Sequence, residues 1–382
     1  MNEPLREARP DEIAGWDART VDVPGGDVQQ SRAWAAHRAR SGARPRHLVF
    51  PSGFAVLGLE RRRPLIGGGR LYLPRGPVAA GEPATRTAER LAAVAAWARA
   101  AGLDAVLSDA EIPAATGYAA LLAELGFRPV EEVGPSRHRV AVPIPAGADD
   151  AALLEPIAKA TRQRFGSAER RGARVVRYDA LAGSRTLPGF EAPSGGAAGA
   201  AARAAFARFH GLLVATGERR GFAIGPLEAA VAWWTAAFEA GHLVLLEVRS
   251  REDDLLAAAI LYRHGRRLSY AHSGDRVELR HAHPGAIHLL LWRALQLAAR
   301  EGRAELDLGG VDVAGARDEP RPGEPMWGLY EFKRSFGGRW VEMSGAHEAV
   351  LRPVRHLLGA ALAGAARCAG RGRARSGGSG GG

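Results

Sequence analysis

One lysine near the C-terminal end of the chain stands among aromatic and apolar residues and is followed by a glycine pair. Lys333 lies in the segment Phe-Lys-Arg-Ser-Phe-Gly-Gly, which covers residues 332–338. An ammonium group held in a fixed place can stabilise the oxyanion that forms when a nucleophile attacks a carbonyl. We therefore treat Lys333 as a candidate catalytic cation that Phe332 holds in place. The alternative is a basic turn whose aromatic residues only pack.

A second segment accompanies this lysine. Residues 305–311 read Glu-Leu-Asp-Leu-Gly-Gly-Val, and residues 328–338 read Gly-Leu-Tyr-Glu-Phe-Lys-Arg-Ser-Phe-Gly-Gly. Together they resemble the Fem family, the non-ribosomal peptidyltransferases that build the side branches of peptidoglycan from aminoacyl-tRNA. In that family a strand ending Asp-x-Gly-Gly precedes a loop and then Gly-Leu-Tyr-x-Phe-Lys-x-x-Phe-Gly-Gly.

Other motifs extend the resemblance over residues 28–355. They are Gln30-Ser31-x-x-Trp34, Tyr72-Leu-Pro-Arg-Gly-Pro-Val78, Thr216-x-x-Arg219-x-x-Phe222, and Tyr270-Ala-His-Ser-Gly followed by a helical segment.

The resemblance implies roles for seven residues. Lys333, Phe332 and Asp109 would act in catalysis, with Asp109 accepting or orienting the amine proton. Arg38 and Arg219 would hold the diphosphate of the sugar peptide, because guanidinium groups grip phosphate oxygens in pairs. Tyr72 and Tyr270 would contact substrate. Two positions depart from the family: Arg38 stands where lysine is usual, and Arg220 where an acidic residue is common. A helix cap is the alternative role for Asp109.

Elements of two alternating α/β halves must position these residues. The periodicity predicts strands at 47–59, 71–73, 104–108 and 137–142 and helices at 85–101 and 115–125 in the first half. In the second half it predicts helices at 150–166, 200–216, 227–240 and 286–300, and strands at 173–178, 242–249, 257–264, 267–273 and 304–308.

The resemblance implies two packed GNAT-like (acyl-CoA N-acyltransferase-like) mixed-sheet domains, without the coiled-coil arm of longer members. We expect residues 1–145 plus 345–370 to form the first domain, which would bind the precursor, and residues 146–344 the second. Residues 371–382 form a basic, glycine-ended tail with too little apolar surface to fold.

Composition agrees with a globular protein of two domains. The chain has 382 residues, of which 46% are apolar and 24% charged. No run of eighteen apolar residues appears, and the N-terminus does not resemble a signal peptide. The net charge of +11 comes mostly from arginine and permits a phosphate-rich partner without proving one. Arginines cluster at 162–174 and at 61–70.

Several other sequence patterns give weaker evidence for a function. Cys368 is the single cysteine, which excludes an internal disulfide. The glycine-rich stretch 195–199 fits a linker better than a phosphate loop. His281, His283 and His288 lack the Cys or Asp/Glu partners of a metal site, and Ser335 has no histidine nearby in sequence. We expect neither a metal nor a bound cofactor.

We therefore expect an aminoacyltransferase that moves an amino acid from aminoacyl-tRNA to an amine of a nucleotide- or lipid-linked muramyl peptide. The protein would be a cytoplasmic monomer, with peripheral contact at the inner face of the membrane. Two alternatives stay open: an acyl-CoA-dependent N-acyltransferase, and a non-catalytic RNA- or precursor-binding protein. The sequence leaves open which amino acid is donated, how many are added and whether the acceptor is a small natural-product amine.

Overall fold

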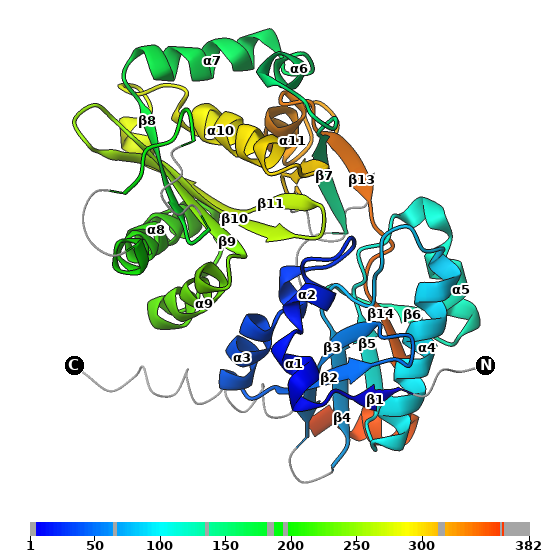
Figure 1. The fold of residues 1–382 in the computed structure, drawn as a ribbon. Coiled ribbons are helices and arrows are strands. Elements are labelled where there is room, and N and C mark those ends of the chain that lie inside the picture. Colours follow the sequence, from blue (N-terminus) through cyan, green and yellow to red (C-terminus); the bar gives the residue numbers. More distant parts are fainter. Residues whose placement is uncertain are drawn as a thin grey trace, which may run out of the picture. The chain divides into compact units, whose positions relative to one another are not determined.

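The computed structural model describes residues 5–63, 67–133, 137–181, 187–193, 198–311, 318–359 and 361–362. The chain forms two compact units, each with its own seven-stranded sheet (Figure 1). The first unit comprises residues 1–13, 38–131 and 344–382, and the second comprises 14–37 and 132–343. Cys368, the tail 371–382 and residues 195–197 lie outside the described part. In that part no helix is both long and apolar enough to cross a bilayer.

The sheet of the first unit has the order β1-β2-β3-β4-β5-β14-β6. Apolar side chains of helix α4 (Ala84–Ala100) and helix α5 (Tyr118–Glu124) pack with those of the strands in one core. The strands are β1 (Arg6–Glu7), β2 (Arg44–Val49), β3 (Ala55–Arg62), β4 (Gly69–Leu73), β5 (Ala105–Ser108), β6 (Arg128–Pro129) and β14 (His347–Val350).

The sheet of the second unit has the order β13-β7-β12-β11-β10-β9-β8. The inner strand β10 (Leu255–His264) is a nearly continuous apolar run buried on both faces, as expected for a sheet covered on both sides. The strands are β7 (His138–Pro143), β8 (Arg174–Asp179), β9 (Leu243–Arg249), β10 (Leu255–His264), β11 (Arg267–Asp275), β12 (Glu305–Asp307) and β13 (Arg339–Glu342).

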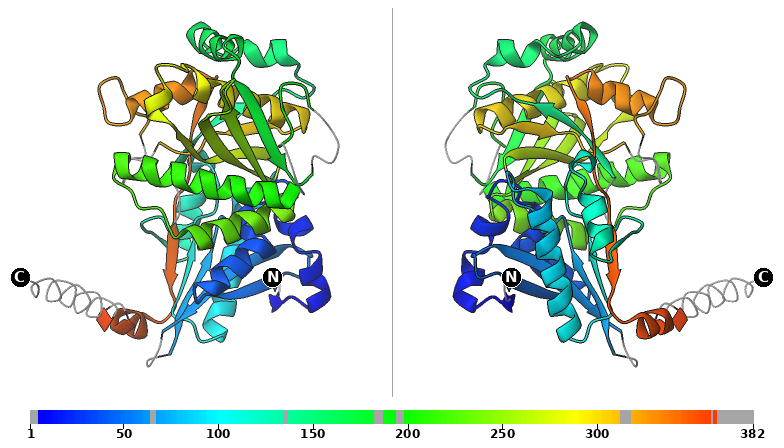
Figure 2. Two further views of the ribbon diagram at one scale, coloured as in Figure 1. Left: turned by 90° about the vertical axis from the view of Figure 1, so that its left-hand side faces the viewer. Right: turned by 90° about the vertical axis from the view of Figure 1, so that its right-hand side faces the viewer.

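Helices cover both faces of this second sheet (Figure 2). One core joins the sheet to α6 (Asp150–Leu154), α7 (Lys159–Arg170), α10 (Ala286–Arg300) and α11 (Trp327–Arg334). The other core joins it to α8 (Ala198–Arg220) and α9 (Leu227–Glu239). Part of the N-terminal chain belongs here too, since Val28 in the short helix η1 (Val28–Gln30) is buried in this second core.

The two sheets repeat one pattern of strand pairing. From β1 or from β8 onward, three antiparallel pairs are followed by one parallel pair and two antiparallel pairs. In each sheet the sixth strand comes from elsewhere in the chain. β7 follows the strands of the first unit but lies between β12 and β13, and β14 follows those of the second unit but lies between β5 and β6.

This exchange changes the expected limits of the units. The return of the chain after residue 345 to the first unit agrees with the expectation, whereas the strand at 137–142 belongs to the second sheet rather than to the first. Residues 14–37 also lie in the second unit. The alternation of side chains marks a strand but not the sheet that it joins, so the spacing along the chain could not distinguish the two sheets.

Two expected elements are split. The strand expected at 47–59 is a hairpin, because residues 51–53 form a turn in which Gly53 has φ +84°. The helix expected at 150–166 is two helices, α6 and α7, because Pro156 lies between them and has no N–H to donate. The remaining expected helices and strands are found within a few residues of their predicted bounds.

Candidate functional site

The parallel strands β11 and β12 separate in the middle of the second sheet. They pair only from Arg267 opposite Glu305 to Ser269 opposite Asp307. Beyond these pairs β11 continues to Asp275, while the chain leaves β12 through residues 308–310. The segment 308–310 belongs to the Asp-x-Gly-Gly motif, so the most specific part of the sequence lies where the two strands part.

Lys333 reaches this point from helix α11. Its side chain is buried, with 6% of the residue exposed. The Nζ donates hydrogen bonds to the carbonyl oxygens of Gly309 at 3.2 Å and Gly310 at 2.5 Å. A Cβ on Gly309 would lie 3.5 Å from the backbone oxygen of Tyr270, so this glycine loop runs against β11. The lysine is thereby fixed beside the diverging strands.

Phe332, the neighbour of Lys333, lies in an aromatic cluster. Its ring meets His288 edge-on, with centroids 5.1 Å apart, and lies 5.6 Å from Phe336. Arg164 lies 3.2 Å from the Nε2 of His288. Burial and the positive charge of Arg164 lower the pKa of His288 to about 4, so the imidazole is neutral at pH 7. His288 is thus a buried, uncharged member of the aromatic cluster.

Tyr270 lies on β11, and Arg219 reaches the end of the same strand from α8. Tyr270 packs against the core that contains α10 and α11, and burial raises the pKa of its hydroxyl. Arg219, near the end of α8, lies 3.7 Å from Asp275 at the end of β11 and donates to the hydroxyl of Thr216 at 3.3 Å. Its side chain is 37% exposed. These two residues and Lys333 all belong to the second unit. Tyr270 lies beside the loop that binds Lys333, and Arg219 lies at the end of β11.

Asp109 and Tyr72 meet in the first unit, where β4 and β5 form the corresponding parallel pair. The Tyr72 hydroxyl donates to Asp109 Oδ2 at 2.8 Å, and the backbone N–H of Arg75 donates to Oδ1 at 2.7 Å. The guanidinium of Arg75 lies 3.9 Å from the same carboxylate. Asp109 therefore fixes the loop after β4 and does not cap a helix. Whether it also orients an amine stays a prediction.

Arg38 adds a cation to this part of the first unit. It lies in helix α3 (Arg32–Arg40) and is half-buried. Burial and the charge of neighbouring Arg61 lower the pKa of Arg38. The two guanidinium groups are close enough to repel each other. An anionic ligand such as a diphosphate would relieve this repulsion. The candidate residues thus form two groups, Arg38, Tyr72 and Asp109 in the first unit and Arg219, Tyr270, Phe332 and Lys333 in the second.

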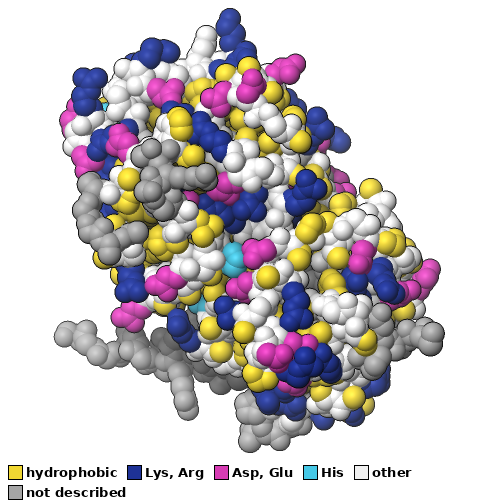
Figure 3. Space-filling view, in the orientation of Figure 1, with side chains coloured by type: hydrophobic (Ala, Val, Ile, Leu, Met, Phe, Trp, Pro, Cys, Tyr) yellow, Lys and Arg dark blue, Asp and Glu magenta, His cyan; other side chains and the backbone are white. Residues whose placement is uncertain are grey.

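The arginine clusters differ in how far they are already paired. Arg62, Arg63 and Arg70 form ion pairs with carboxylates of the first unit. Helix α7 instead carries basic side chains that are exposed, and Figure 3 shows Lys and Arg at several points over this part of the surface. These are Lys159, Arg162, Arg164 and Arg170, with Arg171 directly after the helix.

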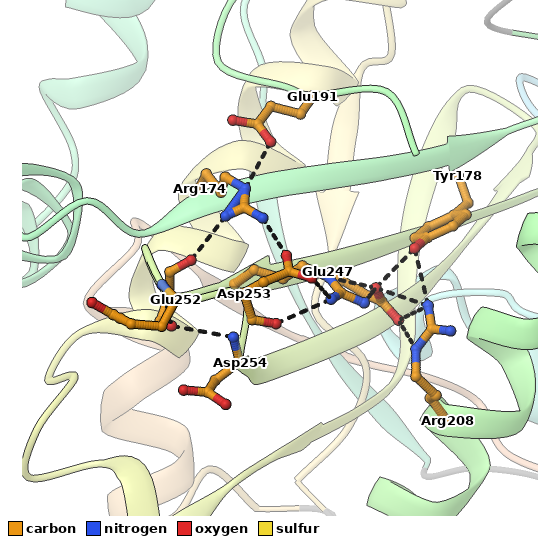
Figure 4. A network of polar contacts seen from close by, with 10 residues as sticks. Arg174, Tyr178, Glu191, Arg208, Glu247, Glu252, Asp253 and Asp254 are labelled. Carbon is orange, nitrogen blue, oxygen red and sulfur yellow. Dashed lines mark hydrogen bonds and ion pairs between the residues drawn. The ribbon is translucent and has the colours of Figure 1, made fainter. Parts of the chain in front are cut away.

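A separate polar network, drawn in Figure 4, surrounds a fully buried carboxylate. Glu247 on β9 accepts from the Tyr178 hydroxyl at 2.9 Å, from Arg249 at 2.7 Å and from Arg208 at 3.1 Å. Arg174, one of the clustered arginines, belongs to the outer part of this network through Glu191 and Asp253. Because these charges satisfy one another, we assign the network to the stability of the sheet.

The sequence did not signal several polar residues that the fold brings near the site. Asp27 comes from the N-terminal part of the chain and His264 and Ser269 from the β10–β11 hairpin, and none of the three belongs to a spacing motif that predicts chemistry. Their neighbour Asp307 is part of the Asp-x-Gly-Gly motif. Within the described ranges, no group of three or more His, Cys, Asp or Glu side chains is arranged to hold a metal ion.

Comparison with known proteins identifies the fold. Residues 159–334 match the family model described as an acetyltransferase (GNAT) domain. The structure titled "Crystal structure of FemX" is similar with a TM-score of 0.72 and 19% identity, covering 93% of this chain and 99% of that one. No curated protein matches this chain in sequence.

Two further solved structures share the fold less closely. L-PGS from Bacillus licheniformis gives a TM-score of 0.51 with 13% identity, covering 93% of this chain and 97% of that one. A conserved protein of unknown function from Bacteroides thetaiotaomicron gives 0.52 with 12% identity, covering 91% and 99%. The expected architecture of two GNAT-like mixed-sheet domains is thereby confirmed, and the resemblance to the Fem family is confirmed at the level of the fold.

Proposed function

We propose that this chain, which shares the fold of FemX over nearly its whole length, is an aminoacyltransferase of the Fem type. It would transfer an amino acid from aminoacyl-tRNA to an amine of a peptidoglycan precursor. The observation that carries the proposal is the buried Lys333, whose ammonium group is held by the carbonyls of Gly309 and Gly310 where β11 and β12 part.

The chemistry that this site would perform follows from charge. The acceptor amine, with a pKa of about 10.4 in water, loses a proton before it attacks the ester carbonyl of the donor. The attack places negative charge on the carbonyl oxygen, and a cation already fixed in a buried position stabilises that charge without reorganisation. In this proposal Phe332, which packs against the core, would exclude water beside Lys333 and so strengthen the interaction.

The basic surface of α7 supports a donor that carries phosphates. Its exposed cations lie on a helix that also packs against α11, since the Thr161 hydroxyl donates to Ser335 at 2.8 Å. Guanidinium groups bind phosphate oxygens, and several of them along one helix suit a nucleic-acid backbone. We assign a phosphate-binding role to Arg38 in the first unit and to Arg219 in the second, and a role in substrate contact to Tyr72 and to Tyr270, each in its own unit.

The proposed reaction also implies substrates, an oligomeric state and a location in the cell. The donor and the nucleotide- or lipid-linked muramyl peptide would meet a monomeric protein in the cytoplasm, with peripheral contact at the inner face of the membrane. Neither a metal nor a cofactor takes part in the proposed reaction.

An acyl-CoA-dependent N-acyltransferase is the second candidate, because the matched domain model is that of an acetyltransferase. One experiment separates the two. The purified chain is incubated with charged tRNA and a muramyl pentapeptide, and in parallel with labelled acetyl-CoA and the same acceptor. A branched peptide formed only from charged tRNA supports the first function, and acetylation supports the second. Binding of either substrate without any product favours a non-catalytic binding protein.

A further inference from the structure

A serine, a histidine and an aspartate lie in contact in one row in the second unit. Nε2 of His264 lies 2.8 Å from Oγ of Ser269, and Nδ1 of the same ring lies 3.2 Å from Oδ2 of Asp27. Nucleophilic serine sites use this order of groups, with a base that removes the hydroxyl proton and an acid that orients the base. Neither the sequence motifs nor the proposed transfer reaction uses these residues.

The surroundings of His264 define which nitrogen carries the proton. Nδ1 also lies 3.2 Å from the carbonyl oxygen of Gly26, so both of its neighbours are oxygen acceptors. The proton of the neutral ring therefore belongs on Nδ1, and the lone pair of Nε2 points to the hydroxyl of Ser269. This is the tautomer that a general base for Ser269 requires.

The fold holds the row in place through a tight hairpin. His264 ends β10 and Arg267 begins β11, and the hairpin tip Gly265 donates its N–H to the carbonyl of Val21 at 2.7 Å. A Cβ at Gly265 would lie 3.2 Å from the carbonyl oxygen of Gly26. Glycine thus permits the close approach that brings Asp27, the N-cap of η1, to His264.

A reactive serine must be accessible to its substrate, and the exposure of the three side chains agrees with this. Asp27 and His264 are buried, with 5% and 4% of each residue exposed, whereas Ser269 is partly exposed. Ser269 is also the last β11 residue paired with β12, opposite Asp307, so it lies where the strands begin to part. A ligand that enters along the free part of β11 would meet this hydroxyl.

Asp307 and Arg139 complete the charges around the serine. Asp307 Oδ2 lies 3.5 Å from Ser269 Oγ, and a guanidinium nitrogen of Arg139 lies 4.0 Å from that same Asp307 oxygen. Arg139 offsets the negative charge near the serine. The same guanidinium donates to Glu305 at 2.5 Å, so Arg139 is held between the two carboxylates of β12.

We propose that Ser269 is the nucleophile of an ester-cleaving site, with His264 as general base and Asp27 orienting the imidazole. The substrate class is an activated carboxylic ester whose acyl group is small enough to enter beside β11. This activity goes beyond the proposed aminoacyl transfer and does not depend on it.

The steps balance in protons and bonds. Ser269 Oγ attacks the carbonyl carbon while its proton moves to Nε2 of His264. The bond between the carbonyl carbon and the leaving oxygen then breaks, and the leaving alkoxide takes that proton. Water then attacks the acyl carbon and loses a proton to Nε2. The bond from that carbon to Ser269 Oγ breaks, and Oγ takes the proton, which releases the carboxylic acid and restores the serine.

The test uses the full chain and two probes, a p-nitrophenyl acetate assay and a fluorophosphonate that phosphonylates reactive serines. We expect one phosphonate per chain, located on Ser269 by peptide mass spectrometry. Ser269→Ala should abolish the label and His264→Gln should slow it at least about 100-fold, as expected for the loss of a general base. Ser167→Ala, on α7, is the matched control and should label as the wild type does.

Mapping the adduct on the unmodified chain keeps the test independent of whether variants fold. No adduct on the wild type, or an adduct on another serine, overturns the proposal. Hydrolysis of the ester that persists in Ser269→Ala overturns it as well. Lys333→Met should still be labelled on Ser269, because the ester-cleaving site does not use Lys333. A chain that is labelled on Ser269 but transfers no amino acid would contradict the proposed function alone, and a chain that transfers an amino acid without being labelled would contradict the ester-cleaving site alone.

Discussion

The ammonium group of Lys333 lies 2.5 Å from the carbonyl oxygen of Gly310. The contact joins the last turn of α11 to the loop that leaves β12, the two most specific segments of the sequence. A lysine held by backbone carbonyls keeps its charge in one position, and a buried charge in a fixed position interacts strongly with a developing oxyanion.

Replacing Lys333 by methionine should therefore lower the rate of aminoacyl transfer about 100-fold to 1,000-fold, as loss of an oxyanion donor does in other enzymes. The measurement is the initial rate of branched-peptide formation with charged tRNA and muramyl pentapeptide. Arg334→Met is the matched control, because Arg334 is the next residue on the same helix but is exposed. Equal losses in the two variants would argue against a special role for Lys333.

The hydrogen bond between Tyr72 and Asp109 predicts coupled effects of mutation. Tyr72→Phe and Asp109→Asn each remove this hydrogen bond. The variant with both changes should therefore be more stable than the sum of the two single losses predicts, by a coupling energy of about 1 kcal/mol. Urea denaturation of the four proteins gives this energy. If the loop after β4 contacts the acceptor, both single variants should also raise the KM for the muramyl peptide. Strictly additive effects would show that the contact does not persist in solution.

Neutral His288 predicts a loss of stability in acid. Its pKa in the folded chain is lowered to about 4, below the ordinary value of about 6.5, so the unfolded chain binds the proton first as the pH falls. The stability at this site is complete above pH 6.5 and is lost progressively between pH 6.5 and 4, by at most about 3 kcal/mol.

Chemical denaturation at a series of pH values tests this in His288→Phe, which keeps a ring between Arg164 and Phe332 but cannot titrate. The variant should show a shallower decline of unfolding free energy in that range. His281→Gln, an exposed histidine on the loop before α10, serves as control and should follow the wild type. A decline in His288→Phe as steep as in the wild type would place the titrating group elsewhere.

The network around Glu247 predicts a large cost for removing one buried charge. Glu247→Ala removes the acceptor of the Tyr178 hydroxyl and one of the two carboxylates that pair with Arg249, which should lower the free energy of unfolding by about 3 kcal/mol. Thermal unfolding provides the measurement. Glu252→Ala, an exposed residue at the outer end of the network in Figure 4, should leave the unfolding midpoint unchanged.

The sequence predicted most helices and strands because their periods and end signals are local. The helix at 286–300 follows from its apolar spacing, and Lys333 stood out because its neighbours are unusual. Neither the exchange of strands nor the row of Ser269, His264 and Asp27 could be predicted in this way. Asp27 and His264 are 237 residues apart, and tertiary contacts such as that of the hairpin tip with residues 21–26 bring them together.

The inserted strands have a consequence for how the protein is made. Until β14 has left the ribosome, β5 and β6 lack the strand that joins them, although every other strand of the first sheet was synthesised far earlier. The N-terminal sheet should therefore be completed last during translation. A nascent chain arrested before residue 347 should be cut readily by proteases in this sheet, while one that includes β14 should resist.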